Sequence, residues 1–539
     1  MGSMGDDAHP DYDVLIVGAG LSGCYSLYRM REQKLKTKVL EAGSGPGGTW
    51  YWNRYPGARF DCESYSYGFS WSQEVLDEFD WTEHFAPQPE TERYINFVCD
   101  KFGLKEDMQF ETRIQSAQFL EGSRIWQLND DKGRTYTSRW LITGMGVLSN
   151  PTLPNLPGVS DFKGTAYHTA RWPAEPVDFT GKRVGIIGTG ATSIQAIPEI
   201  CKTVGDLTVF QRTPNWAIPL HNKKIAPDEM KKIREGYPEL FRRCAETKMS
   251  FIHEAGNKKT TDATAEEREL FWEDLYGQPG FGLWVSNYTD IGLDKAANKL
   301  ISDFVEKKIR QRVHDQKTAD MLIPKNHGFG TRRVPMETHY FEAYNQPNVH
   351  LVDINATPIE RITEKGVKTS EGDFEFDMII YATGFDAVTG AFDAVSFTGM
   401  DGVTLKETWN GGPKTYLGLT AEHFPNMFMI MGPHQMYGNI PRSIEFAVEW
   451  VSNCIEYCRA HDVTWVEAKG DGVEMWTNHV HEVAKGLLSN EIDSWMTGVN
   501  KNVAGKQKRT IARYSGSAQE FRRVCNKVAD DRYNTMLLA

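Results

Sequence analysis

The chain has 539 residues, of which 40% are hydrophobic and 24% are charged, a composition typical of a folded globular protein with about two or three domains. Its formal net charge of −12 repels phosphate backbones and anionic lipids, so we expect neither a nucleic-acid partner nor a membrane-surface role. No apolar run approaches the roughly 20 residues that cross a bilayer. The polar, acidic start has no secretory pattern. The eight cysteines form no C-x-x-C pair, which predicts a cytoplasmic protein without a metal site.

The first recognisable unit, residues 12–41, reads as an apolar strand, a glycine turn, a helix and a second strand, the pattern of a βαβ unit. Gly18, Gly20 and Gly23 follow the spacing G-x-G-x-x-G, which permits a tight turn and brings backbone close to a pyrophosphate at the helix N-terminus. Glu41 ends the second strand, where a carboxylate binds ribose hydroxyls and repels a 2′-phosphate. The unit predicts an FAD site. The alternative is a glycine turn without a ligand, which the combination of strand, helix and Glu41 disfavours.

A second βαβ unit, residues 182–214, repeats this plan with Gly188, Gly190 and Ser193. A serine therefore replaces the third glycine. Arg212 stands where the first unit has its carboxylate, and a guanidinium suits a 2′-phosphate through a charge-assisted pair. This unit predicts an NADPH site, and two dinucleotide sites on one chain imply hydride transfer between them. The alternative for Arg212 is a solvated surface charge.

The remaining elements follow in chain order. The proline-rich segment 150–158, between the two units, marks a candidate domain boundary. Residues 225–320 are charged and helix-patterned with no strand signal, strand patterns return at 348–352 and 378–382, and the stretch after residue 443 mixes amphipathic helix with a basic segment near residues 501–513.

We therefore predict an α/β fold with two Rossmann-like dinucleotide-binding domains and a helical insertion. The FAD-binding domain is expected to comprise residues 1–150 and 385–539. The NADP-binding domain is expected to comprise residues 151–224 and 331–384, with the helical insertion at residues 225–330.

Two longer spaced patterns extend beyond the glycine motifs. The first lies just before the second glycine motif and comprises Phe162, Gly164, His168, Trp172 and Pro173. The second comprises Gly48, Trp50, Tyr55, Pro56, Gly57 and Asp61. Both patterns resemble the fingerprints of type I Baeyer–Villiger monooxygenases, a family of two-dinucleotide flavin monooxygenases. Stretches such as GARFDCESYSY, FGTRRVP and SWMTGVN resemble its cyclohexanone-oxidising branch, and the resemblance covers almost the whole chain. The departures are Ser193, Phe60 and Ile142, and none removes a group that the chemistry needs.

The resemblance implies an enzyme that uses FAD, NADPH and O2 to convert a ketone into an ester or lactone through a flavin peroxide. Negative charge then develops on the peroxide and on its adduct with the ketone, and a fixed guanidinium in a dry site stabilises such charge. The matching residue is Arg333, and Asp61 matches the carboxylate that pairs with it. Arg332 matches the basic residue that contacts the 2′-phosphate. The alternative for Arg333 is a structural salt bridge or another phosphate contact.

Further roles are implied by the same resemblance. Trp495 matches a residue of a mobile C-terminal loop that contacts nicotinamide cofactor or substrate, and Gly48, Trp50 and Asp61 are expected among the cofactor-binding residues. Met436 and Tyr437 match a loop that lines the substrate pocket. The alternative for Trp495, Met436 and Tyr437 is ordinary packing. His168 and Trp172 are expected to couple motion of the NADP domain to the active site, with hinge packing as the alternative.

Three other functions remain open at this point. An N- or S-oxygenating flavin monooxygenase would not need the pair of Arg333 and Asp61. An NADPH-dependent disulfide reductase is disfavoured by the missing C-x-x-C, and a non-enzymatic NADP-binding regulator would be colourless rather than yellow. The expected partners are a ketone and O2, and the expected state is a monomer or weak oligomer.

Overall fold

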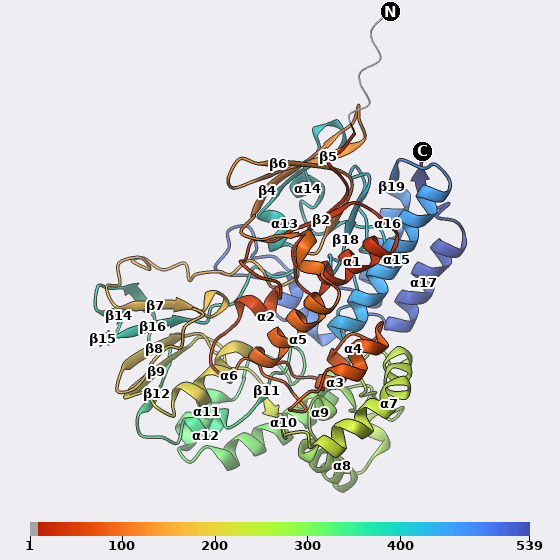
Figure 1. The fold of residues 1–539 in the computed structure, drawn as a ribbon. Coiled ribbons are helices and arrows are strands. Elements are labelled where there is room, and N and C mark those ends of the chain that lie inside the picture. Colours follow the sequence, from red (N-terminus) through yellow and green to blue (C-terminus); the bar gives the residue numbers. More distant parts are fainter. Residues whose placement is uncertain (1–8) are drawn as a thin grey trace, which may run out of the picture.

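A large mixed β-sheet holds the first glycine motif (Figure 1). The computed structural model describes residues 9–539. The sheet has eight strands in the order β17-β4-β5-β6-β1-β2-β3, with β18 also paired to β6. Its strands are β1 (Tyr12–Val17), β2 (Thr37–Leu40), β3 (Met108–Gln109), β4 (Ile114–Leu120), β5 (Ile125–Asp130), β6 (Thr135–Thr143), β17 (Ser396–Thr398) and β18 (Met427–Met429).

The centre of this sheet is parallel, because β1 pairs with β2 on one side and β6 on the other. Val14, Leu15 and Ile16 of β1 are fully buried, as expected for a parallel strand covered on both faces. Helix α1 (Leu21–Glu32) connects β1 to β2. The predicted βαβ unit of residues 12–41 is therefore confirmed.

A second, wholly parallel sheet of five strands has the order β12-β9-β8-β16-β7. Helix α6 (Ala191–Ile200) connects β8 to β9 and completes the second predicted βαβ unit. The strands predicted at residues 348–352 and 378–382 are present as β12 and β16. The five strands are β7 (Thr165–His168), β8 (Arg183–Ile187), β9 (Asp206–Gln211), β12 (Val349–Asp353) and β16 (Met378–Tyr381).

The stretch between β9 and β12 is mainly helical, as its charge pattern predicts, and is drawn in yellow-green and green in Figure 1. Strands β10 (Ile218–Pro219) and β11 (Met336–Glu337) pair at its base. Helix α7 packs against the short helices α3 (Ser64–Tyr67) and α4 (Gln73–Glu78) and against the C-terminal helix α17 (Ala518–Asp530). The helical region therefore contacts elements from both ends of the chain. Its helices are α7 (Pro227–Glu246), α8 (Ala265–Gly277), α9 (Gly282–Val285), α10 (Lys295–Arg312) and α11 (Gln316–Leu322).

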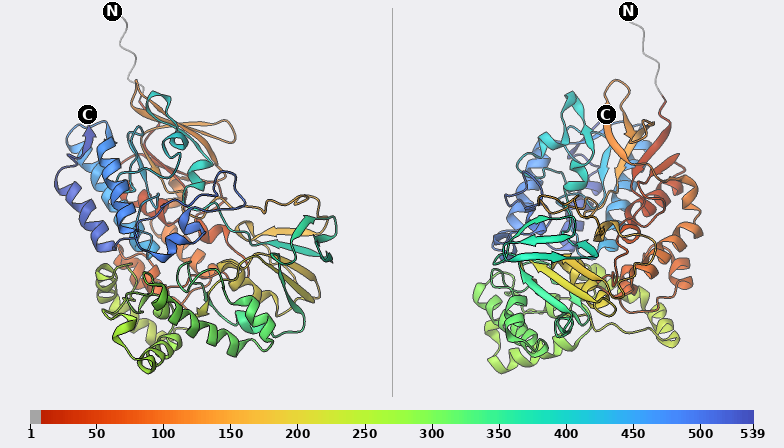
Figure 2. Two further views of the ribbon diagram at one scale, coloured as in Figure 1. Left: turned by 180° about the vertical axis from the view of Figure 1, so that it is seen from behind. Right: turned by 90° about the vertical axis from the view of Figure 1, so that its left-hand side faces the viewer.

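Three helices near the C-terminus stand together at one side of the molecule, as the view from behind in Figure 2 shows. Helix α15 (Ile440–Ala460) packs against α1 and against α17 (Ala518–Asp530). Helix α16 (Gly470–Val483) precedes an irregular stretch that contains the short turn η6 (Trp495–Thr497) and the predicted basic segment. The amphipathic helices predicted after residue 443 are thus present.

No helix in the described residues is long and apolar enough to cross a membrane.

Several helices and strands have no counterpart in the sequence prediction. The additional helices are α2 (Thr49–Trp52), α3 (Ser64–Tyr67), α4 (Gln73–Glu78), α5 (Gln88–Lys101), α12 (Tyr340–Ala343), α13 (Gly390–Asp393) and α14 (Leu405–Thr408). The strands without a predicted counterpart are β3 to β7, β10, β11, β17 and β18, whose bounds are given above, together with β13 (Ile359–Ile362), β14 (Gly366–Thr369), β15 (Gly372–Glu375), β19 (Val466–Ala468) and β20 (Met536–Leu538).

Candidate active site

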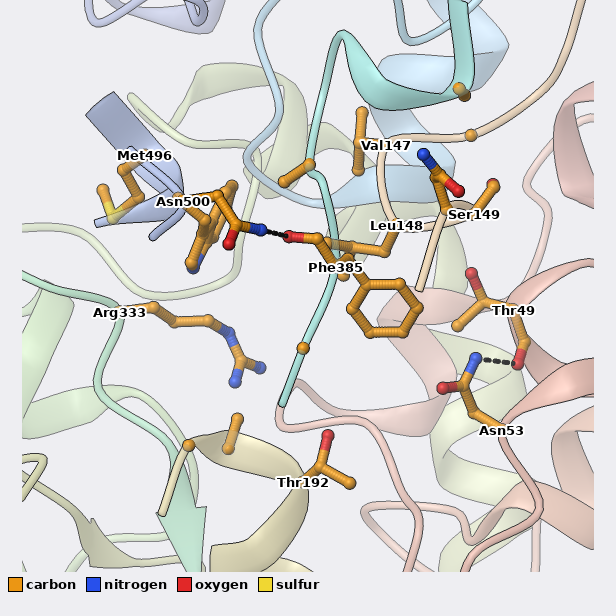
Figure 3. A pocket seen from close by; sticks show the side chains of 18 of the residues that line it. Thr49, Asn53, Val147, Leu148, Ser149, Thr192, Arg333, Phe385, Met496 and Asn500 are labelled. Carbon is orange, nitrogen blue, oxygen red and sulfur yellow. Dashed lines mark hydrogen bonds between the residues drawn. The ribbon is translucent and has the colours of Figure 1, made fainter. Parts of the chain in front are cut away.

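A cavity of about 1480 Å³ is lined by residues from both glycine turns, from the helical region and from the C-terminal stretch. Figure 3 shows its interior, with Thr192 of α6 facing Phe385 and with the guanidinium of Arg333 directed inward. The two βαβ units, far apart in the sequence, thus open onto the same space. This arrangement suits two ligands that exchange a hydride.

The first glycine turn leaves no room for side chains. Gly18 has a φ of +101°, and a Cβ added there would lie 2.6 Å from the carbonyl oxygen of Gly144. A Cβ on Gly23 would lie 1.8 Å from the oxygen of Gly18. Helix α1 begins after Gly20 with no side chain capping it, so its first N–H groups are free to bind an anion. The turn therefore fits the pyrophosphate of a dinucleotide.

Glu41 braces this turn from the end of β2. Its two carboxylate oxygens accept hydrogen bonds from the backbone N–H groups of Ala19 at 2.7 Å and Gly43 at 2.6 Å. Burial raises the pKa of Glu41, and those two N–H groups together with Arg113 and Arg171 oppose the shift. A carboxylate has further acceptor sites, which face the cavity and fit the hydroxyls of a ribose.

The second glycine turn tolerates its serine. Gly188 has a φ of +113°, and a Cβ there would lie 2.5 Å from the oxygen of Ala382. Ser193 fits because its hydroxyl donates to the oxygen of Gly188 at 2.8 Å. Gly190 has open space around it and begins α6 without a side-chain cap. The serine therefore preserves both the turn and the open helix N-terminus.

Arg212 and Arg332 converge on the side of the cavity next to the second turn. Burial lowers the pKa of both guanidinium groups, and the charge of Arg212 lowers the pKa of Arg332 further. Arg332 donates to the backbone oxygen of Asp493 at 2.7 Å, and its Nε is buried without a partner. Neither arginine forms an ion pair with a carboxylate within residues 9–539. A bound phosphate dianion would relieve the repulsion between them.

Arg333 forms an ion pair with the buried Asp61 at the cavity. The Nη2 of Arg333 lies 2.7 Å from Oδ2 of Asp61, whose side chain is 0% exposed whereas that of Arg333 is 34% exposed. The backbone N–H of Met336 also donates to Oδ2, at 3.3 Å. Burial raises the pKa of Asp61, and the guanidinium of Arg333 opposes the shift. Asp61 thus anchors a guanidinium whose free edge faces the cavity.

Gln195 of α6 is a partner of this pair that the sequence prediction missed. Its Nε2 donates to Oδ1 of Asp61 at 3.2 Å and to the backbone oxygen of Arg59 at 3.0 Å. The hydroxyl of Tyr55 donates to Oε1 of Gln195 at 2.8 Å. Tyr55 belongs to the second fingerprint, but no pattern singled out Gln195. The helix that follows the second glycine turn thus contacts the carboxylate directly.

Met436, Tyr437 and Trp495 all line the cavity. Met436 is buried, and the hydroxyl of Tyr437 donates to the backbone oxygen of Gly432 at 2.9 Å. Tyr437 and Trp495 pack into one apolar cluster. The helical region adds further apolar lining residues that were not foreseen, namely Met249, Phe251, Phe281 and Trp284.

The first fingerprint lies outside the cavity. Its fixed residues Phe162, Gly164, His168, Trp172 and Pro173 are absent from the cavity lining. His168 ends β7, where its Nδ1 accepts from the N–H of Ala170 at 3.1 Å and its Nε2 lies 3.2 Å from the oxygen of Thr152. Burial lowers the pKa of His168. These contacts tie the connector to the edge of the five-stranded sheet.

Trp50 and Gly48 line the cavity beside the first turn. Gly48 approaches Gly20 so closely that a Cβ on Gly48 would lie 2.9 Å from the Cα of Gly20. The indole N–H of Trp50 donates to the hydroxyl of Tyr67 at 2.9 Å. Across residues 9–539, no group of three or more His, Cys, Asp or Glu side chains is arranged to hold a metal ion.

Comparison with known proteins gives a consistent assignment. The family model for flavin-binding monooxygenase-like proteins matches residues 12–253. The chain is 42% identical to 2-oxo-Δ3-4,5,5-trimethylcyclopentenylacetyl-CoA monooxygenase of Pseudomonas putida, covering 98% of this chain and 99% of that protein. It is 36% identical to cyclohexanone 1,2-monooxygenase of an Acinetobacter species, covering 97% and 96%. It is also 35% identical to phenazine N-monooxygenase PhzNO1 of Lysobacter antibioticus, covering 99% and 98%.

A solved structure agrees over the same length. The crystal structure of OTEMO in complex with FAD and NADP superposes with a TM-score of 0.95 and 41% sequence identity, covering 98% of this chain and 100% of that one. Matches of this length and identity establish the family. The chain therefore belongs to the flavin-binding monooxygenase-like family and, within it, to the Baeyer–Villiger monooxygenases.

Proposed function

We propose that this chain is an FAD-containing, NADPH-dependent Baeyer–Villiger monooxygenase. It consumes a ketone, O2, NADPH and a proton, and it yields an ester or lactone, water and NADP+. The observation that carries the proposal is the ion pair between Arg333 and the buried Asp61, at a cavity shared by two dinucleotide-binding turns. Bound FAD accepts hydride from NADPH and activates O2, and the protein supplies binding, orientation and charge.

The two turns divide the cofactors by charge. We assign FAD to the turn braced by Glu41 and NADPH to the turn beside Arg212 and Arg332, because a carboxylate repels the 2′-phosphate that two guanidinium groups attract. The FAD-binding residues proposed are Gly18, Gly20, Gly23, Glu41, Gly48, Trp50 and Asp61. The NADPH-binding residues proposed are Gly188, Gly190, Ser193, Arg212, Arg332 and Trp495.

Arg333 is the proposed catalytic residue. Oxygen insertion places negative charge on the carbonyl oxygen of the ketone, and a guanidinium that is already held in position stabilises that charge strongly. Asp61 keeps the guanidinium in place, and Gln195 and Met336 in turn hold the carboxylate. Met436 and Tyr437 form an apolar wall for the ketone.

The domain boundaries, location and oligomeric state belong to the same proposal. Residues 1–150, of which the first eight lie outside the described residues, and residues 385–539 are assigned to the FAD-binding domain, which the pairing of β17 and β18 with strands of the first stretch supports. Residues 151–224 and 331–384 form the NADP-binding domain, into which residues 225–330 are inserted.

All eight cysteines are buried and unpaired, which supports a reducing cytoplasm. We propose a monomer or weak oligomer.

N- or S-oxygenation is the alternative function, and the similarity to a phenazine N-monooxygenase supports testing it. Oxygenation of an amine or sulfide creates no anionic carbonyl oxygen, so a buried carboxylate that holds a guanidinium favours the ketone reaction. The deciding experiment supplies ketones, amines and sulfides separately with NADPH and measures product masses. A gain of one oxygen atom by ketones supports the proposal, whereas a gain confined to amines or sulfides would refute it.

Arg212→Ala should weaken NADPH binding selectively. The substitution removes a charge-assisted phosphate contact of roughly 1.5–3 kcal/mol, so KM for NADPH should rise about tenfold to hundredfold while KM for NADH stays close to that of the parent. Arg183→Ala is a matched control, because Arg183 pairs with Asp377 at 3.0 Å on the surface, away from the cavity. Equal changes for both cofactors would remove Arg212 from phosphate recognition.

Tyr437→Ala should change which ketones fit. The smaller side chain enlarges an apolar wall, and such walls discriminate a methylene by only about 1–3 kcal/mol. We expect a shift toward bulkier ketones by roughly tenfold in relative kcat/KM, with an unchanged rate of NADPH-driven flavin reduction. A ketone panel measures the first quantity and anaerobic stopped-flow absorbance the second. An unaltered ranking of ketones would place Tyr437 outside the substrate pocket.

A further inference from the structure

Arg513 is a cavity-lining cation that the reaction described above does not use. Its neighbours Ala512 and Tyr514 are buried, whereas Arg513 itself is half-buried and lines the cavity. The N–H of His434 donates to the oxygen of Ala512 at 3.0 Å, and the N–H of Tyr514 donates to the oxygen of Gln435 at 3.1 Å. These two backbone bonds fix Arg513 beside the loop that carries Met436 and Tyr437.

The guanidinium of Arg513 has no counter-charge. In residues 9–539 it takes part in no ion pair and no side-chain hydrogen bond, unlike Arg333 and Arg509 nearby in the cavity lining. Burial lowers the pKa of Arg513 to about 10, and only the hydroxyl of Tyr437 opposes this shift. The group therefore stays charged at neutral pH although it is half-buried. Such a cation is costly unless something anionic pairs with it.

No carboxylate of the cavity is available to serve as that partner. Four acidic residues line it, and each is already engaged. Asp61 pairs with Arg333, and Glu41 binds two backbone N–H groups. Asp493 pairs with Arg509 at 2.7 Å and Glu491 pairs with Lys295 at 2.8 Å. The cavity therefore offers Arg513 to an anionic ligand rather than to a carboxylate of the protein.

The cofactor phosphates have other arginines. Arg212 and Arg332 influence each other next to the second glycine turn, and Arg113 and Arg171 both act on the charge of Glu41 next to the first. The pKa of Arg513 responds to none of these groups, and Tyr437 is the one ionisable group that acts on it. The backbone bonds to His434 and Gln435 and the proximity of Tyr437 thus place Arg513 at the wall assigned to the ketone.

We propose that Arg513 binds a carboxylate carried by the ketone substrate, at a distance from the carbonyl that reacts. The preferred substrates are then small keto acids. This inference rests on the proposed function, because it takes the wall of Met436 and Tyr437 as the ketone pocket. A guanidinium binds a carboxylate through two parallel hydrogen bonds. The pair would fix one end of the substrate while Arg333 faces the carbonyl at the other.

The test compares keto acids with neutral partners of the same shape. Linear methyl-ketone acids of increasing chain length are paired with their amides, and each is titrated into the oxidised holoenzyme by calorimetry and then assayed for kcat/KM. The parent protein should prefer the acid of the best length about tenfold to hundredfold over its amide. Arg513→Met should abolish that preference and leave the amide nearly unaffected, and Arg513→Lys should retain part of it.

Lys508→Met is the matched control, since it removes an equal charge from the same segment at an exposed position outside the cavity. It should keep the preference for the acid. Equal affinity of the parent for acid and amide would overturn the inference, as would an equal loss of both ligands in Arg513→Met. If instead neither acids nor amides nor simple ketones gain oxygen, the proposed function itself fails. Should Arg513→Met not fold, the acid-to-amide ratio of the parent and of Arg513→Lys still decides.

Discussion

Arg333→Ala should still oxidise NADPH but should form almost no ester. Hydride transfer needs the two cofactors aligned and creates no anionic oxygen, whereas oxygen insertion does create one. Removal of one charged donor at such an oxygen typically costs about 10²–10³ in rate. The variant should therefore remain yellow, lose its flavin absorbance under anaerobic NADPH, and release the electrons as hydrogen peroxide in air.

Stopped-flow flavin absorbance, product analysis and a peroxide assay together measure these outcomes. Arg332→Ala is the natural comparison, because the adjacent side chain faces the phosphate-binding cluster. It should raise KM for NADPH and keep ester formation tied to NADPH use. Ester formation by Arg333→Ala at the parent rate would disprove the assigned role. A failure of Arg333→Ala to be reduced would move Arg333 to cofactor binding.

The two dinucleotide-binding units could be predicted from sequence because each is local. In residues 12–41 and 182–214, a strand, a glycine turn, a helix and a second strand follow one another, and backbone sterics demand glycine where φ is positive. The structure explains why a serine is tolerated at position 193 but would not fit at position 23. The hydroxyl of Ser193 bonds the turn oxygen at 2.8 Å, whereas the first turn leaves 1.8 Å for a Cβ.

Contacts between residues far apart in the chain could not be predicted from the sequence patterns. The antiparallel strands β4 and β5 and the short strands β17 and β18 carry weak periodicity, and only tertiary pairing identifies them. Gln195 looks like an ordinary helix residue until folding brings it within 3.2 Å of Asp61. Arg513 lies in a basic stretch that reads as solvated, because sequence does not reveal that its neighbours are buried and that no carboxylate reaches it.

The family resemblance supplied the pairing of Arg333 with Asp61, and the structure supplies its surroundings. Three donors converge on the carboxylate, from Arg333, Gln195 and the backbone of Met336. Gln195 belongs to the helix of the second βαβ unit, so the carboxylate is sensitive to the position of that helix. Because these three donors meet on Asp61, substitution of Asp61 tests the role of the ion pair.

Asp61→Asn should lower ketone oxidation by at least about tenfold although the side chain keeps its shape. Asparagine accepts through one oxygen and presents an NH2 group, so one of the three converging donors loses its acceptor and Arg333 loses its counter-charge. An unsatisfied buried donor costs about 1–3 kcal/mol, equivalent to roughly fivefold to 150-fold in rate, and the lost counter-charge of Arg333 adds to this. Asp377→Asn is the matched control, because Asp377 forms an exposed ion pair with Arg183.

The pH dependence of the same variant tests the mechanism independently of the rate at one pH. Burial raises the pKa of Asp61, so its carboxylate takes up a proton at a higher pH than an ordinary aspartate does. Ketone oxidation needs the ionised form, and it is therefore present above this pKa and lost as the pH falls through it. Asp61→Asn has no proton to gain, so its residual kcat/KM for ketone should lack that acid limb. If the limb persists unchanged in Asp61→Asn, another group produces it and Asp61 does not control Arg333 through its charge.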